Sequence, residues 1–195
     1  MTKRPKIKIL SPEKFRVFVS GMDDEMSFRF HYCFQIGSTF VVLGKMEDAI
    51  IHSMSMCDRV KVKTVLGEDA TSWQRMLAKH TALQSSTLGS LIAILSRHNI
   101  LEADLQYLRW LKEKRDFFIH RLFREGAWPG DLDQSECEVM IRRLRYLELI
   151  YDRASSQIWK ILARAGLIEL EVFSDGMLAF NSGIFDDVEE MPKDE

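Results

Sequence analysis

Apolar residues recur along most of the chain at the spacings of three and four that are typical of amphipathic helices. The clearest case is residues 135–165, whose apolar positions form one stripe: Met140, Leu144, Leu147, Tyr151, Ala154, Ile158, Ile161 and Ala165. A stripe of this kind is typical of a helix that packs against other helices along its length. We therefore predict one long helix over residues 135–165.

The same spacing predicts three earlier helices, over residues 27–63, 72–97 and 100–124. The first contains Gly37 and Gly44, which could mark kinks or close contacts with another helix. The second could break at residues 85–87. Together the four segments predict a chain that is mostly helical.

Local residues indicate where these helices begin and end. Three polar residues are each followed three positions later by Gln or Glu, as in a capping box: Thr71, Asn99 and Ser135. Three glycines stand where left-handed C-caps would be needed: Gly67, Gly126 and Gly166. We expect helices to start after the former and to stop before the latter.

Four long helices with short connections predict an all-α fold, an antiparallel four-helix-type bundle over residues 27–166. We expect a basic segment at residues 1–26 and a C-terminal arm with an acidic tail at 167–195. In the arm, apolar residues alternate with Glu169 and Glu171, and Asp175 and Gly176 offer a turn. This pattern allows a small hairpin or an extended arm.

Composition narrows the function classes. No apolar run approaches the roughly 20 residues of a membrane-spanning helix, and no apolar signal core follows the basic start. Cys33, Cys57 and Cys137 have no paired spacing, which is typical of reduced thiols. We expect a cytoplasmic protein with no membrane contact. A net charge of -2 argues against a protein that coats nucleic acid through bulk charge.

The predicted third helix carries the candidate chemistry. Arg115 falls within its apolar stripe, so the guanidinium needs a counter-charge or a water-filled cleft. Asp116 and His120 are four apart, so the carboxylate could accept an imidazole N–H and orient the ring. Arg115 and His120 are five apart, about 140° around a regular helix. The long Arg stem, a distorted helix end or a second copy of the chain could close that gap, and we favour the second copy.

A helical bundle with Arg115, Asp116, three apolar residues and His120 near the end of its third long helix resembles the HEPN superfamily (higher eukaryotes and prokaryotes nucleotide-binding domain). The motif of that family is Arg, four to six residues, then His, often with Asn, Asp or His directly after the Arg. Residues 88–92, with the sequence LGSLI, also resemble the segment before the motif helix in many bacterial members.

The resemblance implies a homodimer in which two motif helices meet in one cleft. Many members are metal-independent endoribonucleases, either toxins of toxin–antitoxin pairs or effectors of phage defence. RNA supplies its own 2′-hydroxyl nucleophile, so the protein needs a base, an acid and cationic donors. Arg115, His120 and Asp116 fit these roles, with the partner's His120 as the acid. The expected partners are an RNA substrate and an antitoxin protein.

Other basic residues of the motif segment are candidates for phosphate contacts. We select Lys114, Arg121 and Arg124 as RNA-binding residues, because residues 109–124 are locally cationic although the chain is not. Each of them could equally be an ordinary solvated charge. The family also contains inactive members, so the alternative function is a catalytically silent helical module for dimerisation or for binding a nucleotide or a partner.

We predict neither a metal nor a cofactor. His31, Cys33, His52 and Cys57 match no zinc-ligand spacing. Asp48 and His52, with Glu47 beside them, are interpreted as a solvated helix face. Some family members carry Tyr two residues after the motif His, where this chain has Leu122, which argues against regulation by modification of such a Tyr.

Overall fold

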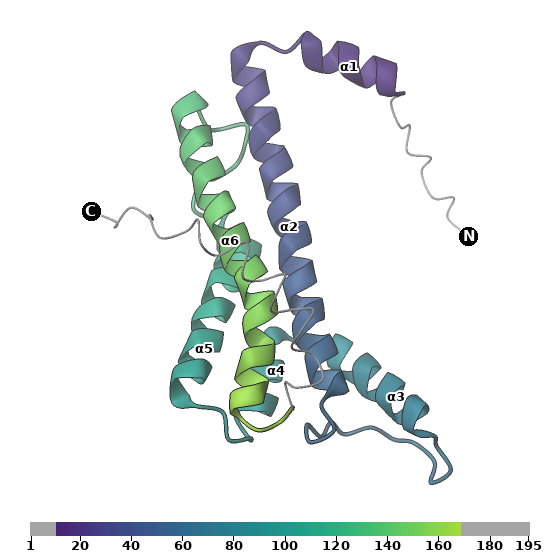
Figure 1. The fold of residues 1–195 in the computed structure, drawn as a ribbon. Coiled ribbons are helices and arrows are strands. Elements are labelled where there is room, and N and C mark those ends of the chain that lie inside the picture. The colour runs from purple at the N-terminus through teal and green to yellow at the C-terminus, as the bar shows by residue number, and fades with distance from the viewer. Residues whose placement is uncertain (1–10, 169–195) are drawn as a thin grey trace. The chain divides into compact units, whose positions relative to one another are not determined.

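The computed structural model describes residues 11–168, and every regular element within this range is helical (Figure 1). The all-α prediction is confirmed. The elements are α1 (Pro12–Ser20), α2 (Asp24–Met56), α3 (Ser72–Gln84), α4 (Leu88–Leu95), α5 (Glu102–Asp116), the π-helical turn η1 (Phe117–Arg121) and α6 (Gln134–Arg164). The hairpin or arm predicted after residue 168 lies outside the described residues, and the antiparallel topology remains a prediction.

Local capping explains where α3 and α4 begin. The N–H of Gln74 donates to Thr71 Oγ1 at 3.3 Å, and the N–H of Thr71 donates to Gln74 Oε1 at 2.7 Å, which confirms the predicted capping box. The predicted break at residues 85–87 is also confirmed. Thr87 caps α4 by accepting the N–H of Ser90 at 3.2 Å.

Two other helix starts differ from the prediction. Helix α6 begins at Gln134 because Asp133 and Glu136 form a reciprocal capping box, with bonds of 2.8 and 2.9 Å between side chains and backbone N–H groups. The predicted cap Ser135 therefore lies inside the first turn. Helix α5 begins at Glu102, two residues later than a cap at Asn99 would place it.

The predicted helix ends are partly correct. Gly126 and Gly166 adopt positive φ angles of 86° and 65°, which favour glycine. At the end of α6 the N–H of Leu167 donates to Leu162 O at 2.9 Å, so Gly166 terminates the helix as expected. Helix α2 ends at Met56 rather than at residue 63, so Gly67 lies in a loop and caps no helix.

Helix α2 is continuous through Gly37 and Gly44. A Cβ atom built on either glycine would meet nothing within 4 Å in the described chain, so neither marks a close helix contact there.

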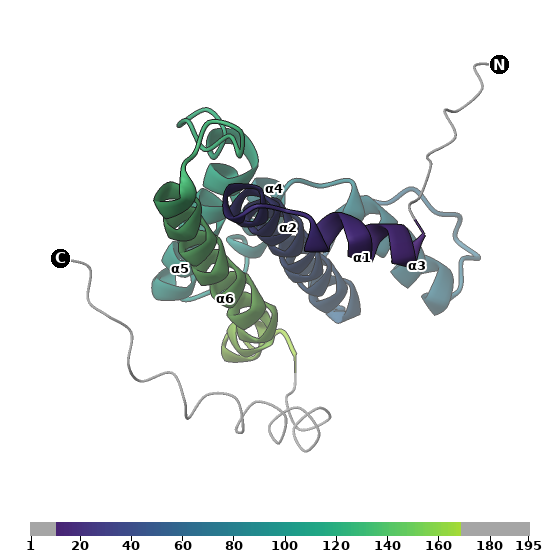
Figure 2. The ribbon, with the colours of Figure 1, turned by 90° about the horizontal axis from the view of Figure 1, so that it is seen from above.

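Helix α1 lies within the segment predicted only as basic, and the sequence analysis missed it. Ser11 caps it by accepting the N–H of Lys14 at 3.4 Å, and Pro12 occupies its first turn. No residue of α1 is buried. Its direction crosses the axis of α2 (Figure 2), and the rings of Phe15 and Phe30 lie 6.2 Å apart.

The described chain divides into two compact units. The motif unit contains residues 11–48 and 109–155, and the second unit contains residues 49–108 and 156–168. In the motif unit, α2 lies beside the first half of α6 (Figure 1). The buried hydroxyl of Thr39 lies 3.3 Å from Glu148 Oε1, and Arg145 Nε donates to Gln35 Oε1 at 3.4 Å.

The second unit has its own core. Its buried side chains include Leu83 of α3 and four residues of α4, namely Leu88, Leu91, Ile92 and Leu95. At the end of α6, Arg164 Nε donates to Asp104 Oδ2 of α5 at 3.1 Å. Just after α2, the thiol of Cys57 donates to Leu167 O at 3.0 Å.

Candidate active site

A change of helix type brings the two motif residues together. After Asp116 the α-helix becomes the π-helical turn η1, in which the N–H of Leu122 donates to Phe117 O, five residues earlier, at 2.9 Å. In such a turn, residues five apart lie about one turn apart on the same side. Arg115 Nη1 and His120 Nε2 are consequently 3.4 Å apart within a single chain.

This geometry corrects the sequence interpretation of the gap between Arg115 and His120. We favoured a second copy of the chain as the means of bringing the two residues together, and that preference is wrong for this pair. The distorted helix end closes the gap, because the extra residue in the π turn rotates His120 back over Arg115. Whether two such pairs meet in a dimer remains a prediction.

Arg115 has the counter-charge that its place in the apolar stripe requires. Its side chain is 24% exposed, and Nε donates to Glu47 Oε1 of α2 at 3.0 Å. Nη1 also lies 3.2 Å from Asp116 Oδ1. The need for an anion was predicted, but Glu47 was assigned to a solvated face, which is wrong. The sequence alone could not identify it, since Glu47 and Arg115 are 68 residues apart.

Asp116 faces cations rather than the imidazole. Its Oδ2 accepts a hydrogen bond from Lys112 Nζ, one turn earlier, and its Oδ1 accepts one from Arg115. Partial burial raises the pKa of the Asp116 carboxyl, but the hydrogen bonds and charges of Lys112 and Arg115 outweigh this and hold the pKa below its ordinary value of 3.8. The predicted bond from Asp116 to His120 is not found; the carboxylate oxygens bind Lys112 and Arg115 instead.

His120 is exposed and available to a ligand. A guanidinium group can only donate, so in its contact with Arg115 the Nε2 atom of His120 accepts. In the tautomer with the ring proton on Nδ1, the lone pair of Nε2 faces this donor. The ring therefore holds the lone pair of a base directly beside a cationic donor.

Tyr151 of α6 fixes the backbone next to Arg115, a role that the sequence analysis did not assign. Its hydroxyl donates to Lys114 O at 3.1 Å, and the side chain has no exposed surface. Burial is the main cause that raises the pKa of the Tyr151 hydroxyl above its ordinary value of 10.0. Tyr151 thus anchors the end of α5 to α6 through a neutral hydrogen bond.

Comparison of the chain with models of protein families, with curated proteins and with solved structures finds no match. The resemblance to the HEPN superfamily therefore rests on the motif residues and their helical context. The roles of these residues are argued below from geometry and chemistry.

The three predicted RNA-binding residues lie along the same stretch of chain as the motif. Lys114 Nζ is 5.5 Å from the centre of the Trp110 ring, and the Arg121 guanidinium is 5.8 Å from the centre of the Phe117 ring. Arg121 and Arg124 are exposed, and Lys114 is half-buried. The structure thus leaves Arg121 and Arg124 accessible to an anion immediately after His120.

Between residues 11 and 168 no group of three or more His, Cys, Asp or Glu side chains is arranged to hold a metal ion. No helix in that range is both long and apolar enough to span a bilayer.

Proposed function

We propose that the protein is a metal-independent endoribonuclease, of the kind that acts as the toxin of a toxin–antitoxin pair or as a phage-defence effector. The observation that supports this proposal is the 3.4 Å approach of Arg115 Nη1 to the exposed His120 Nε2. In this contact an exposed imidazole lies beside a guanidinium in the motif unit. The resemblance of the segment to the HEPN motif supplies the reaction class.

The proposed reaction uses the nucleophile that RNA carries. His120 Nε2 takes the proton of the 2′-hydroxyl, the 2′-oxygen bonds to phosphorus, and the bond from phosphorus to the 5′-oxygen breaks. The leaving 5′-oxygen takes a proton from an acid, which we assign to the partner's His120. Arg115 donates hydrogen bonds to the phosphoryl oxygens, whose negative charge grows in the transition state. The products are a 2′,3′-cyclic phosphate and a 5′-hydroxyl end.

Substrate binding would rearrange the contacts of Arg115. A phosphate oxygen is a better acceptor for Nη1 than a neutral imidazole. When Nη1 turns to phosphate, the Nε2 lone pair of His120 becomes free to accept the 2′-hydroxyl proton. Glu47 would keep Nε in place during this change, since it binds a different nitrogen of the guanidinium.

A second candidate function is supported by the same ion pairs. Two carboxylates, Glu47 and Asp116, already bind Arg115 within one chain. With both carboxylates bound, the guanidinium of Arg115 can have a purely structural role, which is to join α5 to α2. In that case the unit is a catalytically silent helical module for dimerisation or for binding a nucleotide or a partner protein.

An RNA cleavage assay in EDTA separates the two candidates. We expect the full chain to cleave RNA and both His120→Ala and Arg115→Ala to lose cleavage by at least about 100-fold. His31→Ala and Arg142→Ala are matched controls, because both residues are exposed in the motif unit. No cleavage by the parent protein, or robust cleavage by both folded variants, would exclude the nuclease and favour the silent module.

A further inference from the structure

An exposed aromatic ring follows the motif segment in the motif unit. The ring of Trp128 stacks on the ring of Phe123, with their centres 4.5 Å apart and their planes inclined by 23°. Phe123 is half-buried, whereas Trp128 is 56% exposed. An exposure of this size, with one face of the indole against Phe123, leaves the opposite face open to a second flat group.

The backbone that carries Trp128 is held by contacts within the motif unit. The buried hydroxyl of Tyr32, on α2, donates to Ala127 O at 2.8 Å. Ala127 is itself buried, and Gly126 before it has a φ angle of 86°, which favours glycine. Burial is the main cause that raises the pKa of Tyr32 to about 12, so its hydroxyl is a neutral donor. A ring on a backbone fixed in this way loses little conformational entropy when it binds a ligand.

The stacked pair lies close to His120 along the chain. Helical turns continue after η1, since the N–H of Glu125 donates to Arg121 O at 3.1 Å. Residues three apart in such turns are neighbours on the same side, with Cβ atoms about 5–6 Å apart. Phe123 is three residues after His120. The ring of Phe123, and with it the ring of Trp128, therefore lies next to the imidazole of the candidate active site.

The charges around the stacked pair favour an anionic ligand. Arg121 and Arg124 are exposed, and Glu125 is the only acidic residue between positions 117 and 130. Proteins that bind single-stranded nucleic acid combine cationic side chains, which contact the phosphates, with aromatic rings on which the bases stack. Residues 120–128 supply both kinds of group.

We propose that Trp128 is a stacking platform for an unpaired base of the RNA, and that the protein therefore selects single-stranded RNA. The proposal rests on RNA as the ligand of the proposed function and adds the strand state of that ligand. A base in a duplex stacks on its neighbours within the helix, so it reaches a side-chain ring only after unpairing. Every base has a flat face, so the platform is tolerant of sequence.

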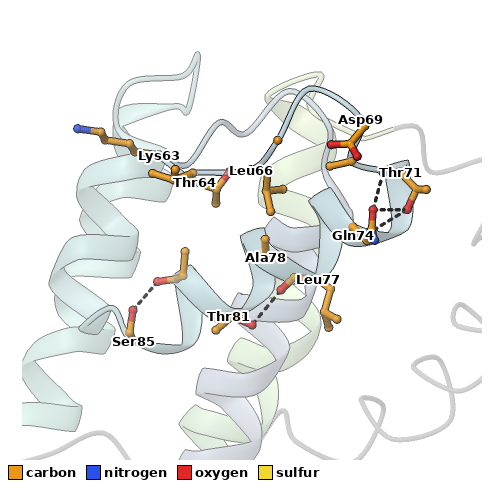
Figure 3. A pocket seen from close by; sticks show the side chains of 14 residues that line it. Lys63, Thr64, Leu66, Asp69, Thr71, Gln74, Leu77, Ala78, Thr81 and Ser85 are labelled. Carbon is orange, nitrogen blue, oxygen red and sulfur yellow. Dashed lines mark hydrogen bonds between the residues drawn. The ribbon is translucent and has the colours of Figure 1, made fainter.

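The second unit supplies a control residue. Trp73, at the start of α3, is 67% exposed and so matches Trp128 in accessibility. An open pocket of about 910 Å³ lies beside α3, between the loop of residues 63–67 and short side chains that include Ala78 and Thr81 (Figure 3). None of the described residues that line this pocket is aromatic, so it offers no comparable platform. Trp73→Ala should therefore leave RNA binding unchanged.

RNA binding by the full chain tests the proposal, on a His120→Ala background that prevents cleavage. The probes are a labelled oligoadenylate and an RNA duplex of equal length. We expect Trp128→Ala to weaken oligoadenylate binding by about tenfold, the loss of one stacked base, and to change duplex binding little. Trp128→Phe keeps an aromatic face and should retain most of the affinity. Circular dichroism and urea unfolding check that each variant is folded.

The outcome for the platform can be separated from the outcome for the nuclease. Loss of affinity in Trp128→Ala, with no cleavage by the parent protein, would support the platform and exclude the nuclease. Cleavage by the parent protein, with equal affinity of the background protein and Trp128→Ala, would do the reverse.

Three further results would overturn the platform. The first is no binding of oligoadenylate by the background protein, and the second is an equal loss of affinity for the duplex. The third is conversion of a dimer to a monomer by Trp128→Ala in sedimentation, because the ring would then be a contact between subunits.

Discussion

Arg115 and His120 approach to 3.4 Å between Nη1 and Nε2 although five residues separate them, because the π-helical turn adds one residue to the helix between them. A regular α-helix would set the two side chains about 140° apart. π turns within helices often occur at functional sites. The local backbone therefore creates the pairing of Arg115 and His120 on which the candidate active site depends.

Exchanging Ile119 and His120 tests the importance of the π turn. In the variant Ile119→His/His120→Ile, the Arg and His are four apart, the spacing that pairs side chains on a regular helix. We expect cleavage to fall by at least about 100-fold, because the π turn aligns residues five apart instead. Retention of activity in a variant with unchanged circular dichroism would show that the π turn is not needed.

Removing the carboxylate of Glu47 should destabilise the motif unit. The side chains of Glu47 and Arg115 are 31% and 24% exposed, so Glu47→Gln leaves a half-buried guanidinium without its charged partner. We expect the free energy of unfolding, measured in urea, to fall by about 1–2 kcal/mol. Glu113→Gln, an exposed site on α5, is the control and should change it little. Equal stabilities would mean that the ion pair contributes nothing.

Much of the fold was predictable because it depends on local pattern. The apolar stripe of α6 is buried from Met140 to Ile161 as predicted, and the Thr71 capping box and the break before α4 need only neighbouring residues. Helix α1 was missed although Ser11 and Pro12 are a recognisable start signal. No residue of α1 is buried, so the spacing of its apolar residues does not indicate a core-facing helix.

The site was harder to predict, because it depends on an exception to helical geometry and on a distant partner. The residue types of Arg115, Asp116 and His120 indicate a candidate site. The geometry of a regular helix, however, pairs Asp116 with His120 and keeps Arg115 away from His120, and both expectations are wrong. The π turn joins His120 to Arg115 and leaves Asp116 with Lys112. Glu47 comes from another helix, and no spacing along the chain indicates it.

Asp116 should make the free energy of unfolding depend on pH. Its folded pKa lies below the ordinary value of 3.8, so the ionised carboxylate stabilises the fold above that pH, and this contribution is lost as the pH falls through the folded pKa. We expect Asp116→Asn to be less stable than the parent at pH 7, by under about 1 kcal/mol because the site is partly exposed. Urea unfolding should show the difference shrink as the pH is lowered below 3.8. A difference that does not change with pH would contradict this linkage.

Tyr151→Phe should weaken the anchor of α5. The variant keeps the packing of the ring but leaves the carbonyl of Lys114 without its donor, at 3.1 Å in the parent. We expect a loss of about 1–2 kcal/mol in the free energy of unfolding. Tyr146→Phe, a half-exposed site on the same helix, is the control. If the hydrogen bond also positions the motif, kcat for RNA cleavage falls while KM is unchanged.

Arg121 and Arg124 can be tested by the salt dependence of RNA binding. Each phosphate contact to a single strand contributes about 0.7 to the slope of the logarithm of the binding constant against the logarithm of salt concentration. On a His120→Ala background, which prevents cleavage, we expect Arg121→Gln and Arg124→Gln each to reduce that slope by about this amount. Arg142→Gln removes an exposed charge from α6 and should leave it unchanged. Equal slopes in all three variants would show that RNA does not follow the chain beyond His120.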